Sequence, residues 1–322
     1  MYACSPGWKA DWLPIEDARK ILTWLSECFK SRYPPGLSRV IGVNWGLHFT
    51  GGEPFLNFNL LLELVRLAGE LGIPSTFVET NCFWCNSDGV VEERFKALRE
   101  AGLHGVLVSV NPFIVERVPF ENLERAISVG REIFGGNLLI YHELFYEQLR
   151  SLGIRGTLSF EEYLSLMAER QPQSLAAALS FPSLLPMGRI PYKLGHLYRH
   201  YPASRFFHES CRSEIVREWH IHIDNYGNYV AGYCGGLTFG DARKPESLLK
   251  GLDLNEHPVI KALISPGGLG LLYKLAEKHG YREKPEGYIS KCHLCVDLRR
   301  HLAAHGAFKE LKPLGFYEHL ED

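Results

Sequence analysis

Short apolar segments that alternate with helical patterns constrain the fold of this chain more than any other feature. Strands are expected over 40–49, 75–80, 105–110 and 137–142, with helices over 57–72, 87–102 and 120–134 between them. Parallel strands need a crossover of about a dozen residues or more, usually a helix. The alternation therefore predicts an α/β fold of βαβ units around a parallel sheet, open or closed into a barrel.

Flanking segments extend this pattern at both ends. A helix is expected over 13–29, and Cys28 lies seven residues after Ile21 on its apolar face, so we expect it to be a small core residue. After the fourth strand, helical patterns occur near 145 and over 160–169. We count the apolar run at 175–185 as a fifth strand.

Polar residues follow each expected strand at its C-terminal end, at 50–53, 79–82, 109–111 and 142–143. Ligands of parallel sheets bind at that edge, which predicts a binding site there. In HFTGGEPFL, the two glycines give a ligand access to the backbone, and Glu53 could receive a cationic group. The nearby Cys82-Phe-Trp-Cys85 could bind a metal, act as a redox pair or fill a loop, and we favour the loop.

The pattern changes after residue 185, where proline and glycine become frequent. The segment 219–233 alternates apolar and polar residues around a turn and predicts a β-hairpin. We place a boundary near 188–205 and expect domains over 1–190 and 191–322. His220 and His222 share one face of the first hairpin strand and could form a metal pair, although histidines with ordinary hydrogen-bond partners are expected more often.

Four cysteines of this C-terminal region come from three segments: Cys211 precedes the hairpin, Cys234 ends it, and Cys292 and Cys295 form a CxxC. Four thiolates would suit Zn²⁺ or a 4Fe–4S cluster, and their chemistry alone does not choose between the metals. The alternative is a reactive or buried CxxC with two unrelated core cysteines.

Composition excludes several classes of partner and location. The formal net charge of −2 gives no electrostatic footprint for nucleic acid or an anionic membrane. No apolar run approaches the roughly 18 residues of a membrane-spanning helix, and the N-terminus is too polar for a secretory signal. We therefore expect a cytoplasmic protein whose eight cysteines are not disulfides.

Several of these motifs together resemble the radical S-adenosylmethionine (SAM) enzymes. They are TGGEPFL at 50–56, TN at 80–81, SVN at 109–111 and PMGR at 186–189. The run from Cys211 through IDNYGNYVAGYC to the CxxC resembles the auxiliary-cluster extension of that superfamily, of the SPASM or twitch type. The resemblance implies a partial (β/α)₆, TIM-like barrel followed by a small metal-binding domain of a β-hairpin and helices.

The resemblance also implies roles for individual residues. Glu53, with Gly51 and Gly52, would receive the ammonium of SAM, and the other expected pocket residues are Thr50, Asn81, Ser109, Asn111 and Arg189. The metal ligands would be Cys211, Cys234, Cys292 and Cys295, holding an auxiliary 4Fe–4S cluster. The implied activity is radical chemistry on a peptide or other small substrate, with electrons from a reductant such as flavodoxin or ferredoxin.

The sequence departs from this family at one decisive point. It contains no CxxxCxxC, the loop that holds the SAM-cleaving 4Fe–4S cluster and follows the first strand of the family's barrel. We expect that the sequence begins at an internal methionine, after that strand and loop, and that the chain as given does not cleave SAM; Cys4 cannot replace three ligands. The alternatives are a non-catalytic protein with a tetracysteine Zn²⁺ or Fe–S site, or an adaptor that binds a peptide.

Overall fold

The computed structural model describes residues 5 and 7–322, so Cys4 lies outside the described residues. The chain forms two compact units. We call Ala18–Leu184 the sheet unit, and the described residues up to Asp17 together with Leu185–Asp322 the cysteine unit. The sequence placed the boundary somewhat later, near 188–205.

The sheet unit contains a parallel sheet of four strands in the order β1-β2-β3-β4. Its strands are β1 (Leu47–Phe49), β2 (Thr76–Thr80), β3 (Gly105–Ser109) and β4 (Leu138–Tyr141). In register, Phe49 lies opposite Val78, Val78 opposite Val106, and Val106 opposite Leu138. The strands are parallel, as the alternating pattern predicted, and each strand follows its neighbour in the chain.

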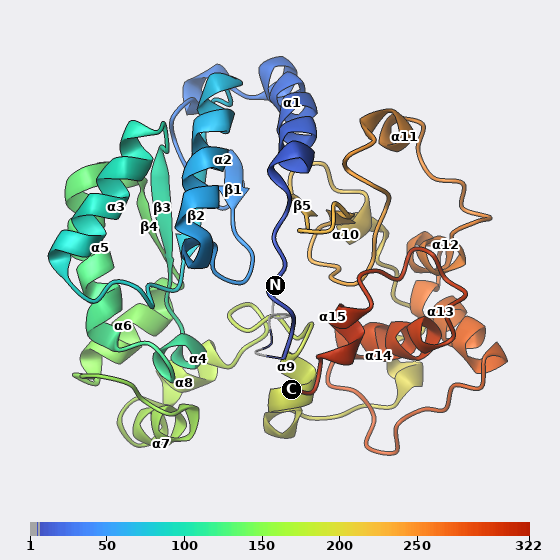
Figure 1. Ribbon diagram of the computed structural model, residues 1–322. Coiled ribbons are helices and arrows are strands. Elements are labelled where there is room, and N and C mark those ends of the chain that lie inside the picture. The colour runs from blue at the N-terminus through green and yellow to red at the C-terminus, as the bar shows by residue number, and fades with distance from the viewer. Residues whose placement is uncertain (1–4, 6) are drawn as a thin grey trace. The chain divides into compact units, whose positions relative to one another are not determined.

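Helices precede, connect and follow the four strands, as Figure 1 shows. They are α1 (Ile15–Arg32), α2 (Phe58–Glu70), α3 (Asp88–Glu100), α4 (Pro112–Val115), α5 (Phe120–Phe134), α6 (Glu143–Ser151), α7 (Phe160–Arg170) and α8 (Pro172–Ala178), with short 3₁₀ helices including η2 (Pro54–Asn57). Asn57 and Ser87 begin α2 and α3 by accepting hydrogen bonds from Leu60 N and Val90 N. These caps explain why each helix starts just after the polar residues that follow the preceding strand.

The two faces of the sheet have different neighbours. Val78, Val106 and Val108 are fully buried on the face against which α5 packs. On the other face, Phe77 and Leu107 form a small apolar cluster with Ile41, and Leu139 and Tyr141 pack on it. Because side chains alternate along a strand, the residues two positions after Phe77 and Leu107, Glu79 and Ser109, belong to this second face.

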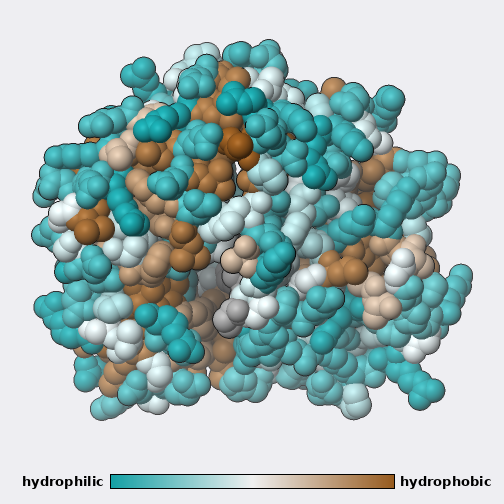
Figure 2. Space-filling model, viewed as in Figure 1, coloured by the Kyte–Doolittle hydropathy of each residue, from teal (hydrophilic) through white to brown (hydrophobic). Residues whose placement is uncertain are grey.

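Apolar side chains are also exposed near the edge strand β1, which has one strand neighbour in the described part of the chain. Val43, Trp45 and Leu56 are the large examples, and Leu56 is 63% exposed. In Figure 2, hydrophobic side chains gather over the region where Figure 1 places α2 and β1.

Three expectations from the sequence are wrong. The segment 40–49 is a strand only at its end, because Gly42 and Trp45 pair in a tight turn before β1. The fifth apolar run is not a strand: α8 begins at Pro172 and continues through three alanines, the best helix-forming residue, and turns follow it. Cys28 is exposed on α1 rather than in the core.

The cysteine unit contains the predicted hairpin and a group of helices. Strands β5 (Ile221–Ile223) and β6 (Tyr229–Ala231) pair antiparallel. The helices are α9 (Ile190–Leu194), α10 (Arg212–Ile215), α11 (Pro245–Leu249), α12 (Pro258–Ile264), α13 (Gly268–Lys278), α14 (Lys291–Ala304) and α15 (Gly315–Glu318). Cys211 and Cys295 are part of the core that α12, α13 and α14 share.

None of the helices in residues 5 and 7–322 combines the length and the apolarity that crossing a membrane requires.

Candidate functional site

Polar side chains from three strands converge on Glu79 at the C-terminal edge of the sheet. Thr50 Oγ1 donates to Glu79 Oε2 at 3.1 Å, and Ser109 Oγ donates to Oε1. His48 Nε2 lies 3.3 Å from Oε2, at ion-pair distance, and its ring stacks on Phe77 with centroids 4.3 Å apart. A half-buried carboxylate with three polar neighbours thus lies above the apolar cluster of the same face.

The surroundings of Glu79 keep it ionised. Burial alone would raise the pKa of this carboxyl. His48 lowers it through its hydrogen bond and charge, Ser109 and Thr50 lower it further, and the net pKa lies below the usual value. Glu79 is therefore an anion at neutral pH, suited to receiving a cationic group of a ligand.

Glu53 is placed differently, behind the end of β2. It is 5% exposed, and its carboxylate accepts from Phe55 N at 3.2 Å, Thr80 Oγ1 at 2.9 Å and Asn81 N at 2.7 Å. Through these bonds it begins η2 and ties the end of β1 to the end of β2. A carboxylate has about four lone-pair sites, so one acceptor position remains for a ligand.

The net pKa of Glu53 is raised, whereas that of Glu79 is lowered. Burial raises the pKa of Glu53 from 4.5 to about 7, because the hydrogen bonds from Asn81, Phe55 and Thr80 offset only part of the desolvation and the charge of Glu79 raises it further. Two carboxyl groups at one sheet edge therefore have pKa values that their surroundings move apart. Such a pair can provide one fixed anion and one group that holds or releases a proton near neutral pH.

The other residues expected in the pocket have mixed placements. Gly51 and Gly52 are exposed, with open space where a Cβ would lie, and Gly51 has a φ of +138° that favours glycine. Asn81 Oδ1 accepts from Phe83 N, and Asn111 Oδ1 accepts from Ile114 N and begins α4. The two asparagine side chains thus shape their loops.

Arg189, the remaining expected pocket residue, belongs to the cysteine unit. Its guanidinium donates to the main-chain oxygen of Asp322. Its expected place near SAM stays a prediction.

The Cys82–Cys85 loop is buried beside Glu53. Both thiols are fully buried, and Cys82 has a left-handed φ of +63°. Burial, hydrogen bonding to Cys85 and the nearby Glu53 carboxylate raise the pKa of Cys82 well above its usual value. Trp84 stacks on Phe55 with centroids 4.2 Å apart. A buried thiol with a raised pKa is a poor nucleophile, and the stacked aromatic packing beside it favours the loop-filling interpretation.

The four C-terminal cysteines occupy one neighbourhood of the cysteine unit. Cys211 precedes α10, Cys234 follows β6, and Cys292 and Cys295 lie in the first turns of α14. Burial raises the pKa of Cys211, and electrostatic repulsion from Cys295, Cys234 and Cys292 raises it further. Burial and the charges of Cys295 and Cys234 raise the pKa of Cys292 to about 12.

Cations surround this thiol cluster, by which we mean Cys211, Cys234, Cys292 and Cys295. The positive charge of Lys291 lowers the pKa of Cys211 and Cys292, and those of Arg299 and Arg217 lower the pKa of Cys234. In all three thiols the effect of burial on the pKa exceeds that of the cations, so the pKa values stay raised. The N-terminal end of α14 adds further positive potential at Cys292 and Cys295.

Among these cations, Arg299 is the one that most strongly indicates a nearby anion. It is 3% exposed, and its Nη1 donates to Gly235 O at 2.8 Å and to Tyr317 Oη at 3.1 Å. Its buried Nε has no hydrogen-bond partner, and no carboxylate pairs with the guanidinium among the described residues. A buried charge is costly unless an opposite charge lies close, and the thiols are the groups that can provide it.

Arg217 is also held against the cluster. Its guanidinium lies between the rings of Trp219 and Tyr233, 4.6 and 4.5 Å from their centroids, and pairs with Glu214.

The glycines after Cys234 allow the chain to turn closely here, since a Cβ on Gly235 would lie 2.7 Å from the Phe316 ring and Gly236 has a φ of +75°.

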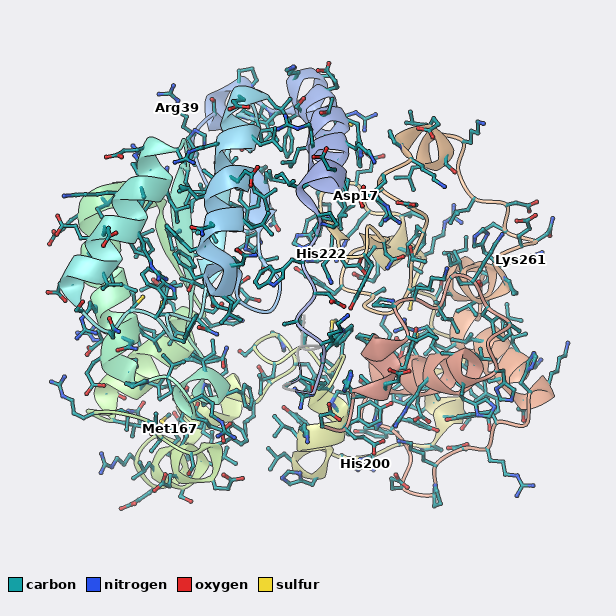
Figure 3. The ribbon with its side chains drawn as sticks, viewed as in Figure 1. Asp17, Arg39, Met167, His200, His222 and Lys261 are labelled. Carbon is teal, nitrogen blue, oxygen red and sulfur yellow. The ribbon has the colours of Figure 1, made fainter. Side chains whose placement is uncertain are left out.

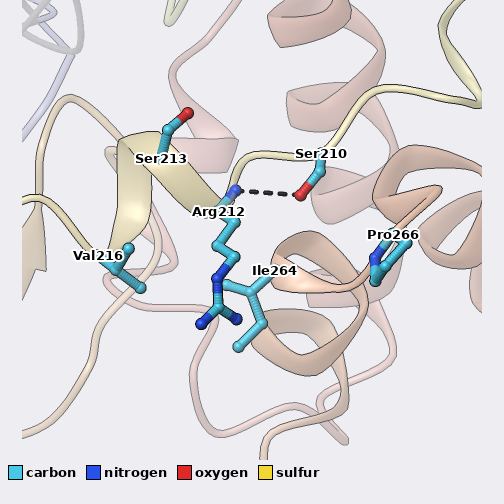
Figure 4. A pocket seen from close by; sticks show the side chains of 6 residues that line it. All are labelled: Ser210, Arg212, Ser213, Val216, Ile264 and Pro266. Carbon is cyan, nitrogen blue, oxygen red and sulfur yellow. Dashed lines mark hydrogen bonds between the residues drawn. The ribbon is translucent and has the colours of Figure 1, made fainter.

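A surface hollow of about 650 Å³ lies beside Cys211 in the chain. Figure 4 shows its lining, which comprises Ser210, Arg212, Ser213, Val216, Ile264 and Pro266. Arg212 N donates to Ser210 Oγ at 3.2 Å, while the Arg212 side chain is exposed. The hollow is open to solvent.

No group of three or more His, Cys, Asp and Glu side chains in residues 5 and 7–322 is arranged to hold a single metal ion. The four thiols therefore interact electrostatically without closing on one point. A 4Fe–4S cluster binds each thiolate through a different iron, so its four thiolates lie farther apart than the four thiolates of one zinc ion. The donor set, its burial and its cations fit such a cluster.

The sequence placed Glu79 among the polar strand ends of the predicted site but assigned it no role, and it did not identify His48. Both lie in expected strands, and the signal that could have found them is alternation: His48, Thr50, Glu79 and Ser109 continue the face that Phe77 and Leu107 begin. Comparisons with models of known protein families and with curated proteins find no match for this chain.

Proposed function

We propose that this chain is a radical SAM enzyme, or the part of one that binds SAM and an auxiliary 4Fe–4S cluster. The observation that carries the proposal is the thiol cluster with its cations. A 4Fe–4S cluster with four thiolates carries net negative charge, and the buried Arg299 pairs with no carboxylate among residues 5 and 7–322. Lys291 and Arg217 add charge of the same sign around the same thiols.

The sheet edge supports the second part of the proposal. SAM carries an ammonium and a sulfonium, and its amino-acid end needs an anion and exposed backbone groups. Gly51 and Gly52 leave open space at the end of β1, and Glu79 provides an ionised carboxylate on the same edge. We assign Glu79 to the cationic part of SAM together with Glu53, whose carboxylate accepts three hydrogen bonds from the chain.

When bound, the auxiliary cluster would supply electron transfer or a point of attachment for the substrate. The protein's own part is to hold and to shield. Cys211 and Cys295, both 8% exposed, would keep the cluster out of water, and Arg299 would balance its charge. The substrate class that we propose is a peptide or another small molecule.

Iron content tests the metal site. The full chain is reconstituted anaerobically with iron and sulfide, and bound iron, sulfide and zinc are counted. The proposal expects about four irons per chain and a visible sulfur-to-iron absorption band. Zinc retained in place of iron, with no visible band, would instead support the non-catalytic tetracysteine protein.

SAM binding tests the sheet edge separately. Equilibrium dialysis against labelled SAM should show binding that weakens at least tenfold in Glu79→Gln, because a hydrogen bond to a charged group contributes about 1.5–3 kcal/mol. The exposed helical Glu63→Gln is the matched control and should bind as wild type. Equal affinities for the two variants would remove Glu79 from the site.

A further inference from the structure

His220 and His222 form a second concentration of metal-binding groups, separate in the chain from the four cysteines. Both are half-buried, and they lie at the start of the hairpin, where His222 is part of β5 (Figure 3). Their two Nε2 atoms are 3.3 Å apart, and their ring centroids are 4.7 Å apart. We propose that this pair binds one zinc-like divalent cation through the two Nε2 atoms.

The separation of the nitrogens fits a tetrahedral ion. Zinc binds histidine nitrogen at about 2.0–2.1 Å, so two ligands at a tetrahedral angle lie about 3.3–3.4 Å apart. The observed 3.3 Å agrees with this value. The spacing of two residues on an extended chain places both rings on one face without distortion of the backbone.

The hydrogen bond on the far side of His222 prepares it as a ligand. His222 Nδ1 lies 2.7 Å from the main-chain oxygen of Gly232 on the neighbouring part of the hairpin. A carbonyl oxygen can only accept, so Nδ1 carries the proton, and in the neutral ring Nε2 presents a lone pair. Histidines that bind metals commonly have such a bond, which fixes the ring and raises its basicity.

Two aromatic rings and one cation lie close to the histidine pair. The rings of Trp219 and Tyr233 flank His220, with centroids 5.7 and 5.0 Å away. The nearby positive charge of Arg217 is engaged by these same two rings and by Glu214. Two histidines fill two of the four positions of zinc, and water or a donor atom of a ligand would complete the shell.

The chain provides a matched control in a second histidine pair. His301 and His305 lie four residues apart at the end of α14, a spacing that also allows chelation on a helix. Here, however, His301 Nε2 lies 2.9 Å from His279 O, and His305 Nδ1 lies 2.9 Å from His301 O. The carbonyl oxygen of His279 thus engages the His301 nitrogen that would bind the metal.

The test counts zinc bound to the full chain. Wild type, His220→Asn, His222→Asn and the control His301→Asn are each dialysed against Zn²⁺ and analysed for bound metal, with circular dichroism to confirm folding. Each hairpin variant should bind one zinc fewer than wild type, or bind that ion at least tenfold more weakly, while the control keeps it. Zinc held by the thiols is common to all four proteins and cancels in the comparison.

A spectroscopic readout decides the matter even if the hairpin variants do not fold. Nitrogen-15 spectra of the histidine rings in wild type should show the Nε2 signals of His220 and His222 shifting as Zn²⁺ is added. The proposal is overturned if the hairpin variants bind as much zinc as the control, or if zinc shifts other histidines and leaves these two unchanged. Because the site uses no cysteine, it does not depend on the proposed iron–sulfur function.

Discussion

The chain contains two CxxC motifs with the same spacing and opposite surroundings. Cys82 and Cys85 lie in a loop after β2, fully buried, beside the Glu53 carboxylate and the ring of Trp84. Cys292 and Cys295 begin α14, near Cys211, Cys234 and three cations. Burial raises the pKa of Cys82 and of Cys292, but only at the second motif do neighbouring positive charges oppose it.

The difference shows what CxxC spacing does and does not determine. Two thiols three residues apart can meet one metal or one cluster, yet they bind it only as thiolates. A carboxylate neighbour disfavours the thiolate, as Glu53 does at Cys82, and a guanidinium favours it, as Arg299 does at Cys234. The neighbours of a CxxC therefore decide its chemistry.

The largest expected difference between the motifs is in iron content. After anaerobic reconstitution, Cys292→Ser should lose most of the iron, because it removes one of the four proposed ligands, whereas Cys82→Ser should keep about four irons. Iron and sulfide analysis after gel filtration measures both. Loss of iron in both variants would mean that the loop motif also contributes to a metal site, and would break the distinction.

The free energy of unfolding should instead depend more on the loop that contains Cys82 and Cys85. Trp84 is 6% exposed, stacks on Phe55, and donates from Nε1 to Thr80 Oγ1 at 3.1 Å. Trp84→Ala should lower the free energy of unfolding by about 3–5 kcal/mol, as for other large core truncations. Urea unfolding measures this loss, and iron binding at the other motif should stay unchanged in the folded protein.

Phe83, the neighbouring aromatic residue of the same loop, is 42% exposed and provides the control. Phe83→Ala should cost much less than Trp84→Ala. Equal costs for the two variants would show that the loop is not anchored through the Trp84 ring.

The features that the sequence predicted well are those that depend on local pattern. The residues 120–134 were expected to form a helix and do so as Phe120–Phe134, and the hairpin and the parallel order of four strands also follow from local alternation. The run at 175–185 misled because its hydrophobicity is the same in a helix and a strand, while Pro172 and the alanines decide for the helix.

Local pattern placed polar residues at this sheet edge, but it did not predict the contacts within the polar cluster, because these depend on the register between strands. Thr50, Glu79 and Ser109 are about thirty residues apart, and only the pairing of β1, β2 and β3 brings them together. The balance of charge around the cysteines is likewise non-local, since Arg299 lies in α14 and affects Cys234 after β6. Spacing identified the four thiols, but not the cations that distinguish them from Cys82 and Cys85.

The free energy of unfolding should depend on pH through Glu53, the carboxyl group beside the Cys82–Cys85 motif. The pKa of Glu53 is raised in the folded protein to about 7 from an ordinary 4.5, so the folded state binds the proton more tightly than the unfolded state. Stability from this group is complete below about pH 4.5 and is lost as pH rises through about 7, by up to about 3 kcal/mol.

Urea unfolding across this range, compared between wild type and Glu53→Gln, isolates the contribution of Glu53. The variant should lack the decline, because its amide does not titrate. Glu79→Gln should keep the decline, since the pKa of Glu79 is lowered and its stabilising effect is lost only at more acidic pH. A wild-type decline that persists unchanged in Glu53→Gln would assign it to another group.

Arg299 offers the finest test of the contrast, because it changes the charge at the second motif without changing a thiol. In iron-loaded protein the guanidinium should attract the anionic cluster by about 2 kcal/mol at the screening typical of protein interiors. Arg299→Met should therefore reduce the stabilisation that iron loading confers, measured as the difference in unfolding free energy between loaded and iron-free protein. It should also lower the midpoint potential of the cluster, because a nearby cation favours the reduced, more negative form.

Arg300→Met, on the same helix but with its guanidinium paired to Glu321, should change both quantities less. If the two variants behave alike, charge at Arg299 is not what separates the two motifs, and the four thiols must differ from Cys82 and Cys85 by number alone.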